Sequence, residues 1–212
     1  MILRFAKPSD YKSLAKLHLA CSVNQPNGFM FKLGLPFLKT YYKLLINEKY
    51  SVIIIADDEN ANLLGFASGT MDAAAHLKNL KKNRFRIGFS IIPSIIKSPM
   101  ILNKIIDHER FVLSKEGYVQ FGVMTGPRAE YWAWDPKDRS NMAIPLLKSL
   151  FLTMFNLGAS SVRAEVDINN ENLLTIYKFL GAKVIEHLKL NDGRKRAIIE
   201  YSSDLKLKWL QR

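Results

Sequence analysis

The chain has 212 residues, with 48% hydrophobic and 24% charged side chains, which is the composition of an ordinary soluble globular domain. A formal net charge of +12 favours polyanionic partners, namely nucleic acid, an anionic membrane surface or a phosphorylated small molecule, although such a charge also serves solubility alone. The single cysteine excludes an internal disulfide, and no leader peptide or convincing membrane span is apparent, so a cytoplasmic protein is expected.

The first third of the chain predicts a strand, two helices and a hairpin. A short strand over 2–6 precedes a helix over 8–22, and a second amphipathic helix is predicted over 33–49. Residues 50–58 form a β-branched run that ends in acidic turn residues, and 61–72 returns as the next strand.

Residues 73–129 break this rhythm, because they are basic, helical in parts and interrupted by two prolines. Strands and helices then alternate, which favours a mixed sheet covered by helices. In chain order the pattern predicts a strand over 130–136, a helix over 141–157, a strand over 161–167, a helix over 170–180, and a hairpin of strands over 182–190 and 194–202.

Two stretches in this second half, "WDPKDRSNMAIPLL" and "NNENLLTIYKFLGAKV", resemble the acetyl-CoA core of the GNAT superfamily of N-acetyltransferases. Asn170, Tyr177 and Gly181 fit the spacing of the last motif of that core. The resemblance implies an α/β fold with a mixed, mostly antiparallel central sheet flanked by helices on both faces. It also implies one domain over 1–212 with an insertion at about 73–129, and acetyl transfer from acetyl-CoA to a primary amine.

The expected pyrophosphate loop departs from the family pattern, because "KDRSNMAI" contains no glycine. Counting forward from Arg139 places Met142 and Ile144 at the two small positions, whereas counting back from the end of the next helix places Asn141 and Ala143 there. The second register is preferred, since asparagine is the non-glycine residue best suited to left-handed backbone. A helix N-terminus still offers free N–H groups to a diphosphate. The resemblance therefore assigns the cofactor to Arg139, Ser140, Asn141, Met142 and Ala143, with loss of acetyl-CoA binding as the alternative.

The resemblance also assigns roles in catalysis. Backbone groups of Ala133 and Trp134 would hold the pantetheine and polarise the thioester, and Tyr177 would protonate the departing thiolate, with packing as its alternative role. Glu130 is a candidate base, or equally a solvated glutamate at a strand edge. Asn170 is counted with the cofactor-binding residues, although helix capping is the role expected first.

The basic stretch "HLKNLKKNRFR" leaves three possibilities open: a clamp for a phosphate-bearing acceptor such as a nucleotide-linked amino sugar, a patch that touches a membrane surface, or a solvated helix face. An amphipathic lid over the acceptor site would also explain the apolar residues of this segment. The four histidines are scattered and suggest no metal site. A binding module without catalysis is the main alternative to an enzyme, and nucleic-acid binding comes third because no recognition motif is readable. The oligomeric state stays open. The clamp residues are Lys78, Lys81, Lys82, Arg84 and Arg86.

Overall fold

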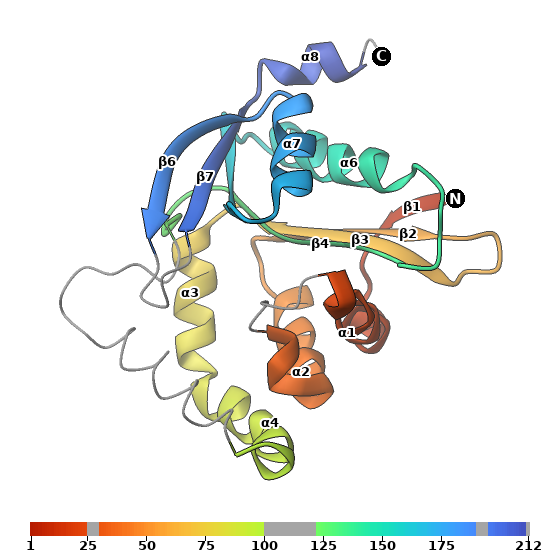
Figure 1. Ribbon diagram of the computed structural model, residues 1–212, viewed down its shortest axis with the longest axis vertical. Helices are drawn as coiled ribbons and strands as arrows, with labels where there is room; N and C mark the ends of the chain where they lie inside the picture. Colours follow the sequence, from red (N-terminus) through yellow and green to blue (C-terminus); the bar gives the residue numbers. More distant parts are fainter. Residues whose placement is uncertain (25–29, 100–121, 190–194, 211–212) are drawn as a thin grey trace.

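The protein is described from a computed structural model that covers residues 1–24, 30–99, 122–189 and 195–210 (Figure 1). Its centre is a seven-stranded sheet in the order β1-β2-β3-β4-β5-β7-β6. Every neighbouring pair is antiparallel except β4 and β5, which run parallel, so the predicted mixed and mostly antiparallel sheet is confirmed. The strands are β1 (Ile2–Phe5), β2 (Ser51–Asp57), β3 (Leu63–Thr70), β4 (Arg128–Trp134), β5 (Ser161–Asp167), β6 (Lys183–Lys189) and β7 (Lys195–Ser202).

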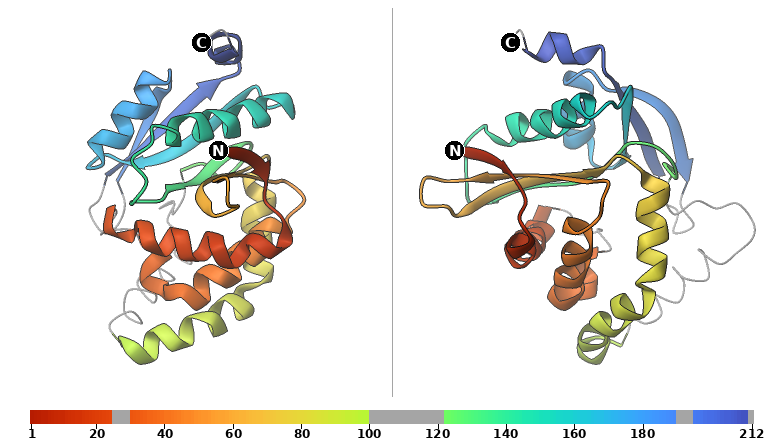
Figure 2. Two further views of the ribbon diagram at one scale, coloured as in Figure 1. Left: turned by 90° about the vertical axis from the view of Figure 1, so that its right-hand side faces the viewer. Right: turned by 180° about the vertical axis from the view of Figure 1, so that it is seen from behind.

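Helices cover both faces of the sheet, as the sequence predicted (Figure 2). On one face lie α1 (Tyr11–Ala20) and α2 (Gly34–Ile46), and on the other α6 (Ala143–Asn156) and α7 (Glu171–Phe179). The helices α3 (Ala73–Lys82) and α4 (Arg84–Lys97) follow β3, and α8 (Leu205–Leu210) follows β7. Short 3-10 turns occupy Pro8–Asp10, Cys21–Asn24 and Met30–Leu33.

The β-branched run of β2 is buried from Val52 to Asp57, because both of its faces are covered. Val52 and Ile54 join the core beneath α6, whereas Ile53 and Ile55 join the core beneath α1 and α2. This alternation places one hydrophobic core on each side of the sheet and fixes the register of the central strands.

The segment expected over 73–129 differs from the structure at its end. It contains α3 and α4, and 100–121 lie outside the described residues. However, β4 begins at Arg128 because Arg128 pairs with Thr70 of β3, so two residues assigned to the insertion belong to the sheet. No helix in the described part of the chain is long and apolar enough to cross a membrane.

Candidate active site

The sheet opens between its only parallel neighbours. β4 and β5 pair at a single position, Arg128 with Arg163, and β5 then pairs with β7 along its whole length. The rest of β4 therefore has a sheet partner on its β3 side only. Such a divergence exposes backbone groups and leaves room for a ligand between the two strands.

A bulge in β4 places Glu130 at this opening. Ser68 of β3 pairs with Tyr131 and Gly69 pairs with Ala129, which leaves Glu130 as the extra residue. The Ser68 hydroxyl donates to the Tyr131 carbonyl at 3.1 Å and accepts from the Tyr131 N–H at 3.2 Å, so the irregular backbone stays satisfied. Because of the extra residue, Glu130 and Tyr131 both face the side of the sheet on which α1 and α3 lie.

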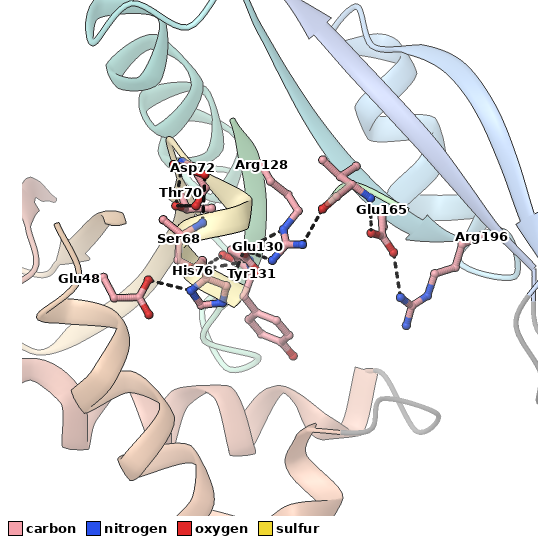
Figure 3. A network of polar contacts seen from close by, with 12 residues as sticks. Glu48, Ser68, Thr70, Asp72, His76, Arg128, Glu130, Tyr131, Glu165 and Arg196 are labelled. Atoms are coloured by element: carbon pink, nitrogen blue, oxygen red, sulfur yellow. Dashed lines mark hydrogen bonds and ion pairs between the residues drawn. The ribbon is translucent and has the colours of Figure 1, made fainter. Parts of the chain in front are cut away.

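Glu130 belongs to a buried polar network that reaches α3 and the turn after α2 (Figure 3). Its Oε1 accepts from Arg128 Nε at 2.9 Å and Nη2 at 2.6 Å and lies 3.9 Å from His76 Nε2. The other ring nitrogen of His76 lies 2.7 Å from Glu48 Oε2. The Glu130 side chain is only 9% exposed, so the alternative of a solvated strand-edge glutamate is wrong.

The same network closes the narrow end of the opening. Arg128 on β4 donates through Nη1 to the Val123 carbonyl at 2.7 Å. The Val123 N–H donates to Glu165 Oε1 on β5 at 3.2 Å, and Arg196 on β7 donates to Glu165 Oε2 at 3.0 Å (Figure 3). Charged groups on three strands are thereby joined where the strands begin to separate.

Tyr177 reaches the opening from the opposite face of the sheet. Its side chain is buried, and its ring centroid lies 6.4 Å from that of Trp132 and 6.2 Å from that of Tyr201. Burial raises the pKa of the Tyr177 phenol well above its ordinary value, which keeps the hydroxyl protonated at neutral pH. A protonated phenol is the form that a proton donor requires.

One pocket joins these groups between β4 and β5. Its lining combines two glutamates, a serine and two tyrosines with apolar residues of α6, so polar residues meet an apolar wall. The structure thus brings the two predicted catalytic residues, Tyr177 and Glu130, to the same pocket. The lining residues used below are Ser68, Glu130, Trp132, Glu165 and Tyr177.

The backbone groups of Ala133 and Trp134, the two residues expected to hold pantetheine, point to opposite sides of β4. The N–H of Asp135 donates to Leu64 of β3 at 2.7 Å. Since hydrogen-bonding direction alternates along a strand, Ala133 directs its backbone groups to β3 and Trp134 directs its own toward the opening. The Trp134 carbonyl accepts from the Cys21 thiol at 3.2 Å, and burial raises the pKa of that thiol to about 11. Trp134 therefore directs its backbone N–H toward the opening, whereas the backbone groups of Ala133 are bonded to β3.

The expected pyrophosphate loop connects β4 to α6, and Ala143 is the first residue of that helix. Ala61 is the only non-glycine residue with positive φ in the described part of the chain, so Asn141 does not adopt the left-handed backbone for which it was preferred. Asp138 instead shapes the loop, because its carboxylate accepts from the Ser140 N–H at 2.9 Å, the Ser140 hydroxyl at 2.7 Å and Trp134 Nε1 at 3.0 Å. Hydrogen bonds from Ser140 lower the pKa of Asp138.

The remaining loop residues are open to solvent or define the start of α6. Arg139, Ser140 and Asn141 are exposed, and Met142 occupies the N-cap position of α6 without a side-chain cap. Asn170 caps α7, since its side-chain oxygen accepts from the Leu173 N–H at 3.2 Å. Its expected role in capping is therefore confirmed, and no contact of Asn170 with the pocket is seen.

The basic residues of the expected clamp do not gather around this pocket. All five are exposed, on the second half of α3 and the start of α4, and Figure 1 shows these helices leading away from the sheet to the far side of α2. The residues are Lys78, Lys81, Lys82, Arg84 and Arg86.

Sequence reasoning missed several residues that the fold places near the site. His18 of α1 is fully buried, stacks on Tyr131 with ring centroids 3.6 Å apart and lies 2.6 Å from the Tyr42 hydroxyl through Nδ1. Burial lowers the pKa of His18 to about 3, so its ring is neutral. Neither His18 nor His76 stands in a motif with its partners, so no local signal in the sequence identifies them.

No family model matches the chain, and no curated protein matches it in sequence. Solved acetyltransferase structures are nevertheless similar over almost its whole length. A ribosomal-protein-alanine N-acetyltransferase from Brucella melitensis is 11% identical, with 95% of this chain and 99% of that chain covered and a TM-score of 0.60. A point variant of the spermidine N-acetyltransferase from Vibrio cholerae is 13% identical, with 99% of both chains covered and a TM-score of 0.59.

A third similar structure, from Salmonella typhimurium, is assigned as an acetyltransferase and contains its cofactor acetyl-CoA. It is 11% identical, with 96% of this chain and 94% of that chain covered and a TM-score of 0.58. The chain therefore has the GNAT-like fold that its sequence motifs indicated. At these identities the likeness establishes the fold, and the chemistry must be argued from the site.

Proposed function

We propose that the protein transfers an acetyl group from acetyl-CoA to a primary amine. The observation that carries this proposal is the meeting of Tyr177 and Glu130 in one pocket, at the place where β4 and β5 diverge. The similar structures support it, because one contains acetyl-CoA and the others are named for N-acetyl transfer to spermidine or to a ribosomal-protein alanine.

The reaction assigns one proton transfer to each residue. The neutral amine attacks the thioester carbonyl carbon, the new C–N bond forms and the C–S bond breaks. Tyr177 donates its hydroxyl proton to the departing thiolate. Glu130 takes the proton lost by the attacking nitrogen, directly or through a water, at Oε2, which has no hydrogen-bond partner in the described part of the chain.

The elements around the pocket fit the donor substrate in part. The outward N–H of Trp134 supports a hydrogen bond to the amide-bearing arm, whereas its carbonyl already accepts from the Cys21 thiol. The N-terminus of α6 offers N–H groups to a diphosphate. Two features weaken the second interaction. Pro145 at the third position of α6 lacks an N–H, and Asp138 places a negative charge inside the loop, opposed by the exposed Arg139 and Lys137.

The charged residues that line the pocket indicate what kind of acceptor it can bind. Its charged lining consists of the carboxylates Glu130 and Glu165, which suit an ammonium group on its way to deprotonation. The basic side chains that were expected to clamp an anionic acceptor lie elsewhere. The proposal is therefore a small acceptor that presents its amine to Glu130, with an amino sugar nucleotide as one member of the panel to be tested.

A binding module without catalysis is the second candidate, and Asp138 favours it because its carboxylate would repel a diphosphate. Thiol release from acetyl-CoA separates the two functions. The protein is incubated with polyamines, aminoglycosides, amino sugars, an amino sugar nucleotide and short peptides, each with and without acetyl-CoA. The enzyme releases thiol with at least one amine, and Tyr177→Phe slows that release. A protein that binds acetyl-CoA and releases no thiol with any of these amines is the binding module.

A further inference from the structure

The helix α4 has two opposite apolar faces, and the described residues pack against only one of them. Ile91 and Ser94 are buried, and the Ser94 hydroxyl donates to the Leu33 carbonyl at 2.7 Å, which seats this face against the start of α2. Ile87 and Ile95 pack against the same core. This face explains why α4 is held on the domain.

The opposite face of α4 is apolar and lies in solvent. Phe85, Phe89, Ile92 and Ile96 are 69%, 71%, 44% and 76% exposed. Their spacing of four, three and four residues places them within a sector of roughly 60° on the helix, along a line of roughly 17 Å. We refer to these four residues as the α4 stripe. A row of large apolar side chains on one face marks a contact surface, whereas single exposed ones are ordinary.

Positive charge surrounds the α4 stripe. Between residues 73 and 99 the sequence contains six lysines and arginines and no aspartate or glutamate. Arg84 and Arg86 project at roughly 100° to either side of the stripe, and Lys97 lies beside its far end. All of the six basic residues are exposed, so they are available to a charged partner.

We propose that the α4 stripe and its flanking basic residues dock the protein on an anionic lipid bilayer. A helix that lies in the plane of a membrane interface inserts an apolar face and directs its cationic side chains to the headgroups, which is the arrangement of α4. Figure 2 shows α4 from two sides at the end of the molecule opposite α8 and away from α6 and α7.

The charge pattern decides between a membrane and a second copy of the chain. A symmetric dimer through the α4 stripe would bring each cationic patch against its own copy, without any acidic residue in this segment to compensate. An anionic bilayer supplies the opposite charge.

Vesicle flotation of the 212-residue chain tests this proposal. Vesicles of phosphatidylcholine alone are compared with vesicles that contain phosphatidylserine or phosphatidylglycerol. The protein should float with the anionic vesicles, and added salt should weaken the binding. The pair Phe85→Ala and Phe89→Ala should reduce the partition coefficient at least tenfold, and each of Arg84→Gln and Arg86→Gln should reduce it about fivefold. Alanine keeps the helix intact, which circular dichroism verifies.

Phe179→Ala is the matched control, because Phe179 on α7 is 77% exposed and lies outside the patch; its partition should equal that of the parent. The proposal is overturned if the parent chain does not float with anionic vesicles at low salt, or if the Phe85 and Phe89 pair floats as well as the parent. Sedimentation equilibrium gives a third outcome that overturns the proposal. The parent would be a dimer, and the Phe85→Ala, Phe89→Ala protein would be a monomer.

Discussion

Replacing Tyr177 with phenylalanine separates chemistry from packing. The Tyr177 hydroxyl makes no hydrogen bond to the described part of the chain, and its ring contacts with Trp132 and Tyr201 are retained by phenylalanine. The free energy of unfolding should therefore change by less than about 0.5 kcal/mol, since a typical hydrogen bond contributes about 1 kcal/mol and none is lost. General acid catalysis contributes roughly 10²–10⁴-fold, so kcat should fall by that factor while acetyl-CoA affinity is preserved.

Tyr201→Phe is the matched control, with the opposite expectation. The Tyr201 hydroxyl is buried and donates to the Tyr177 carbonyl at 3.1 Å, a carbonyl that also accepts from the Ala182 N–H at 3.0 Å. Loss of the hydroxyl should cost about 1 kcal/mol, or a decrease in Tm of about 2–4 °C, and leave kcat within a few-fold of the parent. Thiol release under saturating substrates and thermal unfolding supply the two readouts. A Tyr177→Phe protein with the parent kcat would show that Tyr177 only packs the pocket.

Three further outcomes are expected. Asn141→Glu together with Ala143→Glu adds negative charge at the start of α6, and should weaken acetyl-CoA binding at least tenfold by calorimetry; unchanged affinity would place the diphosphate elsewhere. Burial lowers the pKa of His18 to about 3, so as pH falls the unfolded chain is protonated at His18 before the folded chain is. The free energy of unfolding should therefore decrease between about pH 6.5 and pH 3, by about 2 kcal/mol at pH 5. In urea unfolding, His18→Gln should abolish this pH dependence, whereas His187→Gln, which changes an exposed side chain, should retain it. Asn170→Ala should cost about 1 kcal/mol of stability without changing acetyl-CoA affinity, and an affinity loss would give Asn170 a second role.

The sequence predicted the sheet and its covering helices well, because their apolar periodicity is strong. The run of β2 and the stripe of α6 each specify one arrangement, with β2 buried on both faces and α6 on one. Asn170, Tyr177 and Gly181 lie in one helix or at its ends, so their spacing could be recognised from a short stretch of sequence.

The rest of the site depends on contacts that no local pattern encodes. The bulge that turns Glu130 toward His76 arises from the register of β4 on β3, and Glu48, the second partner of His76, comes from the turn after α2. The choice of Asn141 for left-handed backbone was wrong because hydrogen bonds of Ser140 to Asp138 shape the loop without positive φ. Amphipathic spacing also does not reveal which face of α4 is packed.

Thermal unfolding with and without acetyl-CoA tests the central claim most directly, because it requires no acceptor. A ligand that binds only the folded state stabilises it by about 2.7 kcal/mol at a hundredfold excess over Kd. For a chain of this length that stabilisation corresponds to an increase in Tm of about 5–10 °C, and a smaller increase is expected for the Asn141→Glu, Ala143→Glu protein. An unchanged Tm at millimolar acetyl-CoA would contradict acetyl transfer by this protein.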